Sequence, residues 1–202
     1  MSARGRETIA RLVVAGLYLL LVQSVLRDFL ETGRTTALPL MVSELLVVVF
    51  TILRRPARIV DRSVASVGVT IISAIGPLLV RAGGDSAFVP DAVTTTASTI
   101  GLAVVMAGKL SLGRSFGLVP ANRGVVARGM YGFVRHPIYA GYLLTHLAFA
   151  IAMPQPWNIA VFLLADSALI ARALREERLL VADDEYRSYC QRVAWHFVPG
   201  VF

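Results

Sequence analysis

The chain has 202 residues, of which 56% are hydrophobic and 16% are charged, and its mean hydropathy is +0.67. Soluble domains average about a quarter charged residues, so this composition excludes an ordinary soluble protein and indicates an integral membrane protein. The formal net charge of +7 does not indicate a nucleic-acid partner, because the arginines lie between apolar runs, where they govern topology. The single Cys190 excludes an internal disulfide and a thiolate metal cluster, and we expect no metal site.

Six apolar runs follow one another along the chain, at residues 9–30, 38–53, 63–80, 92–112, 137–153 and 157–174. Each run approaches the ~20 residues that cross a bilayer as an α-helix. The segment "MPQPWN" at 153–158 carries two prolines and no charge, so we expect a helical hairpin over 137–174. The sequence therefore predicts an all-α, polytopic membrane helix bundle of about six transmembrane helices, in one domain spanning residues 1–202.

The basic residues alternate between the ends of these runs. They gather before the first run, in the connection 54–62, between Lys109 and Arg135, and after Arg172, whereas the other connections hold few. By the positive-inside rule, both termini and the loop 113–136 lie in the cytoplasm. The first run lacks a small-residue cleavage site, so we expect a retained helix rather than a signal peptide. The expected location is a bacterial or archaeal cytoplasmic membrane.

A polar stripe runs into the fifth apolar run. Its members recur at i, i+4, i+7 and i+11 on one helical face: Arg135, Tyr139, Tyr142 and His146. Pro137 suits the first position of a helix. Polar side chains in an apolar helix face protein or a cavity rather than lipid, so we predict a ligand site at Arg135, His136 and Tyr139. The alternative is a set of interfacial side chains that snorkel to water.

Charged residues also mark the exit of the sixth run. Arg172 and Glu176 are spaced to form a solvated i,i+4 pair, with Glu177 beside them. The hairpin brings these charges opposite Arg135, which favours a shared site instead. Glu44, inside the second run, is either a paired interfacial acid or part of the same pocket.

Three of these segments together are similar to a known family. "RHPIYAG" at 135–141, followed after one hairpin by "EE" at 176–177, resembles the signature of integral membrane methyltransferases, which include isoprenylcysteine carboxyl methyltransferases and phospholipid N-methyltransferases. "EYRSYCQRVAWHFVP" at 185–199 resembles the C-terminal segment of that family. The resemblance implies a methyltransferase core at 108–202 with a cytoplasmic C-terminal cofactor-binding segment, after variable N-terminal helices at 1–90.

The resemblance also implies roles for individual residues. The cofactor would be S-adenosylmethionine, contacted by residues that match the signature: Arg135, His136, Pro137, Tyr139, Gly141, His196 and Pro199. Pro137 and Gly141 would shape the turn and the close approach. One of Glu176 and Glu177 would meet the amino acid part of the cofactor or orient the acceptor. Arg172 would hold an acceptor carboxylate.

The activity implied is methyl transfer to a lipophilic or prenylated acceptor that arrives from the lipid bilayer. A carboxylate of isoprenylcysteine type is ionised at neutral pH and needs no base. A phospholipid amine or a thiol would need one, such as Glu177, His136 or Tyr139. An NADPH-dependent membrane reductase and a non-enzymatic membrane scaffold are the alternatives outside methyl transfer.

Overall fold

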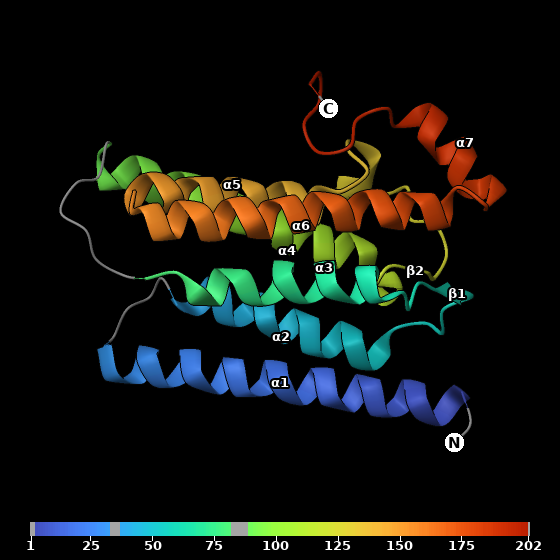
Figure 1. Cartoon of the computed structure of the whole chain (residues 1–202), viewed down its shortest axis with the longest axis horizontal. Helices are drawn as coiled ribbons and strands as arrows, with labels where there is room; N and C mark the ends of the chain where they lie inside the picture. The colour runs from blue at the N-terminus through green and yellow to red at the C-terminus, as the bar shows by residue number, and fades with distance from the viewer. Residues whose placement is uncertain (1–2, 33–36, 82–88, 202) are drawn as a thin grey trace.

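The computed structural model describes residues 3–32, 37–81 and 89–201. Seven helices are present in this part of the chain (Figure 1): α1 (Ala3–Thr32), α2 (Ala37–Leu53), α3 (Val64–Ile75), α4 (Asp91–Leu112), α5 (Pro137–Ala152), α6 (Pro156–Leu180) and α7 (Asp184–Arg192). A 3₁₀ turn, η1 (Gly76–Leu79), extends α3. Each of the six predicted apolar runs forms a helix, so the all-α prediction is confirmed.

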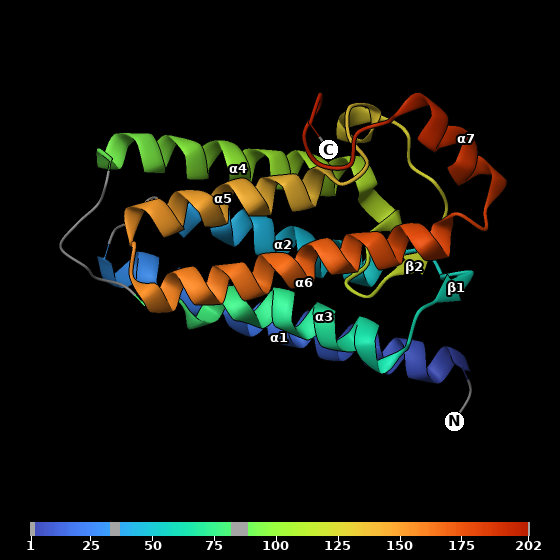
Figure 2. The ribbon, with the colours of Figure 1, turned by 45° about the horizontal axis from the view of Figure 1, so that its top comes forward.

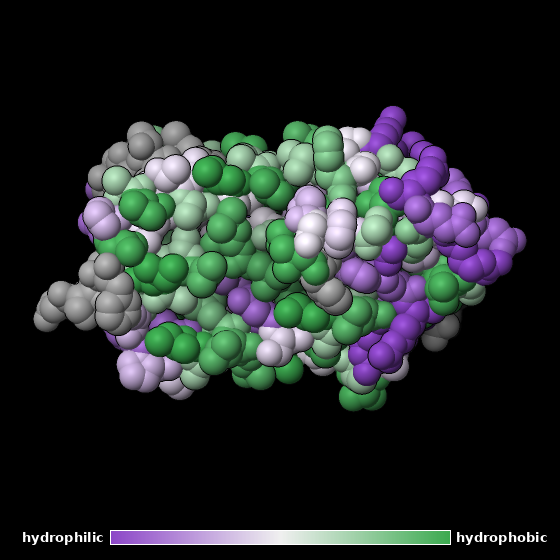
Figure 3. Space-filling view, turned by 90° about the horizontal axis from the view of Figure 1, so that it is seen from above, coloured by the Kyte–Doolittle hydropathy of each residue, from purple (hydrophilic) through white to green (hydrophobic). Residues whose placement is uncertain are grey.

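Three helical stretches are long and apolar enough to cross a membrane: Thr8–Glu31, Asp91–Ser115 and Pro156–Leu180. Three shorter apolar stretches belong to the same bundle: Met41–Leu53, Val64–Leu79 and Pro137–Ala152. Hydrophobic side chains cover the middle of the face seen in Figure 3, while hydrophilic ones gather at the end that carries α7. Large apolar side chains such as Leu12, Leu20 and Leu163 are more than 60% exposed, as expected for contact with lipid. The chain is therefore an integral membrane protein.

The helices pair across the bundle in an order that the sequence does not predict. α1 packs on α2, α4 packs on α5, and α3 packs on α6. The predicted α5–α6 hairpin is present, with its turn at 153–155, but each of its helices packs more extensively on another helix. Glycines permit the α4–α5 approach, since a Cβ on Gly141 would lie 2.6 Å from the carbonyl oxygen of Gly101.

The polar elements of the chain gather at one end of the bundle. Figures 1 and 2 show α7 and the β1–β2 pair there, together with the start of α1 and the end of α6. β1 (Ile59–Val60) and β2 (Ala121–Asn122) are antiparallel. Two further 3₁₀ turns, η2 (Gly113–Ser115) and η3 (Gly129–Gly132), lie in the loop 113–136. The loop 113–136, the start of α1 and α7, which the charge pattern places on one face of the membrane, therefore lie at the same end of the bundle.

Lys109 lies in a different environment from the one that the charge pattern predicts. The charge pattern places Lys109 with the residues of the α4–α5 connection, but its side chain is fully buried inside the bundle. Its Nζ donates to the carbonyl oxygen of Ser43 at 3.0 Å and to Oγ of Ser43 at 2.8 Å. Nζ also lies 3.9 Å from Oε1 of Glu44. Of the two readings of Glu44, the structure supports the paired acid.

Candidate active site

The candidate site begins where the chain enters α5. Pro137 is buried at the first helical position, where its missing N–H breaks no helical bond. The two residues before it pair with the C-terminal segment, since the backbone N–H of Arg135 donates to the carbonyl oxygen of Trp195 at 2.9 Å. The N–H of His136 likewise donates to the carbonyl oxygen of His196 at 2.8 Å. These bonds place the C-terminal segment over the start of α5.

Glu177 lies at the centre of a cluster of basic side chains. Nε2 of His136 lies 2.8 Å from Oε1 of Glu177, and Nε2 of His196 lies 3.3 Å from Oε2. Nη1 of Arg135 lies 3.4 Å from the same Oε2. Both carboxylate oxygens are therefore engaged, and the cluster joins α5, α6 and the C-terminal segment. Charge-assisted bonds of this kind are stronger than neutral ones.

Arg135 also holds the end of α7 in place. Its Nε donates to the carbonyl oxygen of Val193 at 2.8 Å, and its Nη2 donates to that of Cys190 at 3.1 Å. A planar guanidinium can make several bonds of fixed geometry at once, which an ammonium cannot. Arg135 therefore connects α6 to α7 and the C-terminal segment through these bonds.

Glu176 belongs to a second group, one position along α6. The hydroxyl of Tyr139 donates to Oε2 of Glu176 at 3.0 Å. The guanidinium carbon of Arg172 lies 5.2 Å from the centre of the Tyr139 ring, a cation–π distance. Arg172 is only 7% exposed, and its Nη2 donates to the carbonyl oxygen of Gly117 at 3.3 Å. Its buried Nε has no hydrogen-bond partner among the described residues.

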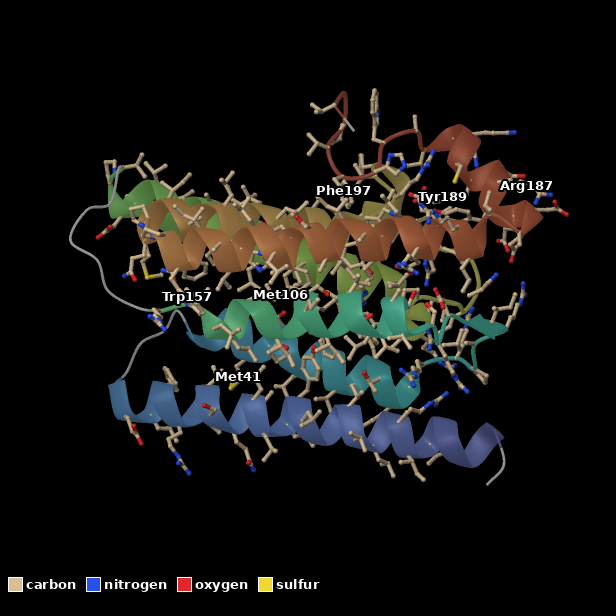
Figure 4. The ribbon with its side chains drawn as sticks, viewed as in Figure 1. Met41, Met106, Trp157, Arg187, Tyr189 and Phe197 are labelled. Atoms are coloured by element: carbon tan, nitrogen blue, oxygen red, sulfur yellow. The ribbon has the colours of Figure 1, made fainter. Side chains whose placement is uncertain are left out.

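Aromatic rings lie over both groups. The rings of His136 and Tyr139 stack with an interplanar angle of 5° and a centroid distance of 5.4 Å. Phe197 lies 5.6 Å from His136, on the C-terminal segment that Figure 4 shows above α6. The site therefore offers flat apolar surfaces beside carboxylates and a buried guanidinium.

The C-terminal segment is held by its own small core. Tyr186, Tyr189 and Val193 are buried together. The Tyr189 hydroxyl donates to the carbonyl oxygen of Tyr131 at 2.8 Å, and burial raises the pKa of this phenol. Asp183 caps α7, and the hydrogen bond from Asn122 lowers the pKa of its carboxyl. Helix α7 is thus fastened to the loop 113–136 before the chain reaches His196.

Two predicted residues lie apart from these groups. Gly141 faces α4, where a Cβ would clash with Gly101 and Val105, so its place in the structure is helix packing. Pro199 is exposed, beyond the segment that pairs with α5. Seven predicted residues are brought together: Arg135, His136, Tyr139, Arg172, Glu176, Glu177 and His196.

The sequence reasoning missed the partners of the deeper polar residues. Nδ1 of His146 lies 2.6 Å from Oδ1 of Asp166, and the His146 ring stacks 6.2 Å from that of Tyr142. The ring of Tyr142 in turn lies 5.8 Å from Nζ of Lys109. A signal existed in each case, because Lys109 and Asp166 both lie inside a predicted apolar run. Such ionisable residues in a membrane helix require a partner inside the bundle.

Fold and site together define a polytopic helical membrane protein with a cluster of ionisable and aromatic residues at one end of the bundle. Within this chain, residues 95–182 match the model of the isoprenylcysteine carboxyl methyltransferase (ICMT) family. The match confirms the predicted resemblance over a segment that includes Arg135, Tyr139 and both glutamates of the pair. A search of curated proteins finds no significant match. The family match supports a membrane methyltransferase.

Proposed function

We propose that the chain transfers a methyl group from S-adenosylmethionine to a carboxylate on a lipophilic acceptor of isoprenylcysteine type. The observation that carries this proposal is the buried Arg172, whose Nε lacks a partner among the described residues, beside Tyr139 and Glu176. A buried donor without a partner costs stability unless a ligand meets it. An arginine fork can bind both oxygens of a carboxylate.

The residues present fit the cofactor. Its adenine ring suits the flat surfaces of His136, Tyr139 and Phe197, which lie within 6 Å of one another in two pairs. Its amino acid part carries an ammonium that suits a carboxylate, and Glu176 is the less engaged of the two. The cofactor supplies an electrophilic methyl group on a sulfonium, so the protein needs to align the partners and exclude water.

The chain's own residues would then divide the work. Arg172 would bind the acceptor carboxylate and orient one oxygen for attack. Tyr139 contacts both His136 and Arg172 and would so connect the cofactor side of the site to the acceptor side. The C-terminal segment would cover the start of α5 and exclude water from the site. We infer that residues 108–202 form the methyltransferase core.

The state of Glu177 favours a carboxylate acceptor over an amine or a thiol. An amine or thiol must lose a proton, and Glu177 was one of the candidate bases. Three basic side chains already engage its two oxygens, and this stabilises the ionised carboxylate. A carboxylate held in this way is a weak base, whereas a carboxylate acceptor requires none.

The test is binding of S-adenosylmethionine to the purified protein in detergent, measured by calorimetry. We expect S-adenosylmethionine and its demethylated product to bind, and NADPH not to bind. His136→Ala should weaken cofactor binding roughly tenfold or more, because it removes a stacking ring and the closest partner of Glu177.

His146→Ala is the matched control. It removes a buried histidine of the same helix that also pairs with an acid of α6, yet lies away from the signature. Its cofactor affinity should equal that of the wild type. Binding of NADPH alone would support the reductase, and binding of neither compound would support the scaffold.

A further inference from the structure

A second candidate site lies on the face of α6 that is turned away from Glu177. A surface hollow of about 370 Å³ is lined by Ile59, Val60, Asp61, Arg175, Arg178 and Leu179. An α-helix turns 100° per residue, so Arg175, Arg178 and Leu179 share one face, from which Glu177 points roughly 150° away. The hollow is therefore separate from the Glu177 cluster, and none of its lining residues is a predicted site residue.

The two arginines keep their hydrogen-bonding capacity. Within the described residues, neither guanidinium makes a hydrogen bond or an ion pair. Asp61 attracts Arg175 electrostatically, but its oxygens accept from the backbone N–H of Ser63 at 2.9 Å and from the hydroxyl of Ser66. The Ser66 bond lowers the pKa of the Asp61 carboxyl, whose role is to fasten the start of α3. The hollow thus presents the guanidinium groups of Arg175 and Arg178 to a ligand, whereas the carboxylate of Asp61 is already hydrogen-bonded.

The hollow lies where apolar helices reach the polar end of the bundle. α3 begins at Val64, three residues after Asp61, and packs on α6. Val64 is 90% exposed and Leu174, one turn before Arg178, is 36% exposed. Ile59, Val60 and Leu179 give the hollow itself a partly apolar lining. A ligand in the hollow would contact the positive charge of the two arginines and the apolar side chains beside them.

We propose that this hollow binds the headgroup phosphate of an anionic phospholipid. Arginine forks bind phosphate oxygens in pairs, and the two here approach one hollow from successive turns of α6. The acyl chains would lie along exposed side chains of α3 and α6 such as Val64 and Leu174. Positive charge at this end is also expected from topology alone. A test therefore has to distinguish a site from general basicity.

The experiment measures lipid binding by native mass spectrometry of the purified protein in neutral detergent. Phosphatidylglycerol, phosphatidylcholine and inorganic phosphate are the three probes. We expect one phosphatidylglycerol to bind more tightly than phosphatidylcholine and far more tightly than inorganic phosphate. Arg175→Gln with Arg178→Gln should weaken phosphatidylglycerol roughly tenfold or more, because both charge-assisted contacts are lost.

Two variants act as controls. Arg128→Gln with Arg192→Gln removes the same charge from exposed positions that do not line the hollow, and it should bind phosphatidylglycerol as the wild type does. Arg178→Gln alone changes an exposed side chain that the fold does not require, and it should give a partial loss. The proposal is overturned if both double variants lose affinity equally, or if phosphatidylcholine binds as tightly as phosphatidylglycerol. Inorganic phosphate that binds as tightly as the lipid would assign the hollow to a free phosphate instead.

Discussion

At the scale of single residues, the two adjacent glutamates of α6 have different partners. Glu177 engages His136, Arg135 and His196, whereas Glu176 accepts from Tyr139. The sequence leaves their roles interchangeable because they are neighbours in a helix. A turn of 100° between them is enough to send one to the C-terminal segment and the other toward Arg172. We infer that Glu177 holds the site together and that Glu176 faces the ligands.

Arg172→Ala tests the acceptor side of the site. It should lower turnover roughly 10- to 150-fold, because a charge-assisted hydrogen bond contributes about 1.5–3 kcal/mol. Cofactor affinity should stay nearly intact. Arg172→Lys should recover only part of the activity, since an ammonium cannot reproduce the two-pronged fork. Turnover of a small prenylated thiol acid and calorimetry with S-adenosylmethionine are the two measurements.

Arg128→Ala is the control for this change, because it removes an arginine whose side chain is exposed on the loop before α5. Each variant is first compared with the wild type in its melting temperature, so that a loss of fold is recognised. Normal turnover by Arg172→Ala would remove the arginine from the acceptor site and leave an amine or thiol as the better acceptor.

At the scale of helices, a buried ion pair joins α2 to α4. Lys109 is fully buried and bonds to Ser43 beside Glu44. Charges inside a membrane bundle are costly unless each has a partner. The Cα–Cβ bond of a helical residue points toward the helix N-terminus, so Lys109 extends into the bundle rather than toward the nearby loop. The pair therefore helps to set how α2 sits against α4.

Lys109→Met should destabilise the protein, because it leaves Glu44 buried without its cation. Breaking a buried pair on one side costs about 3–5 kcal/mol. The double variant Glu44→Gln with Lys109→Met should recover much of this loss, since neither charge then remains. The melting temperatures of the wild type, the single variant and the double variant, measured in detergent, test this expectation.

Leu110→Met is the neighbouring control, since Leu110 is 60% exposed and its replacement should leave the melting temperature unchanged. A Lys109→Met protein that melts with the wild type would show that Glu44 does not depend on the lysine.

At the scale of the whole molecule, the bundle is polar at one end and carries a tryptophan, Trp157, at the other. Nε1 of Trp157 donates to the carbonyl oxygen of Leu79 at 2.9 Å, and Arg81 lies over its ring at 4.6 Å. Figure 4 shows Trp157 at the opposite end of the molecule from Arg187. An amphipathic ring at a helix end is typical of a membrane interface. We therefore expect the two ends of α6 to lie at the two faces of the bilayer.

A reporter fused after Phe202 should be active as a cytoplasmic marker, and one inserted near Gln155 as an external marker. The reason is the excess of arginine at the end that carries α7, together with the opposite position of the α5–α6 turn. Paired fusions to an enzyme active only in the cytoplasm and to one active only outside make the measurement. Finding both positions on the same side would mean that α6 does not span.

The sequence by itself determined the six apolar helices along the chain and seven of the residues that meet at the site. Apolar runs of this length form helices because a bilayer leaves backbone groups no other partner. The signature residues Arg135 and His136 and the glutamate pair lie at the two ends of one hairpin, so chain connectivity alone brings them near each other.

Only the tertiary structure decided which side chain meets which. The rotation of α6 gives Glu176 and Glu177 different partners. Gly141 packs closely against α4, and Lys109 pairs inside the bundle rather than in the loop. The partners of α7 and the C-terminal segment likewise come from distant parts of the chain, as with Asp183, which accepts a hydrogen bond from Asn122. Hydropathy and charge counts record how apolar a segment is and where it ends. They do not record the angle at which one helix faces another, and that angle selects the partners of each buried polar group.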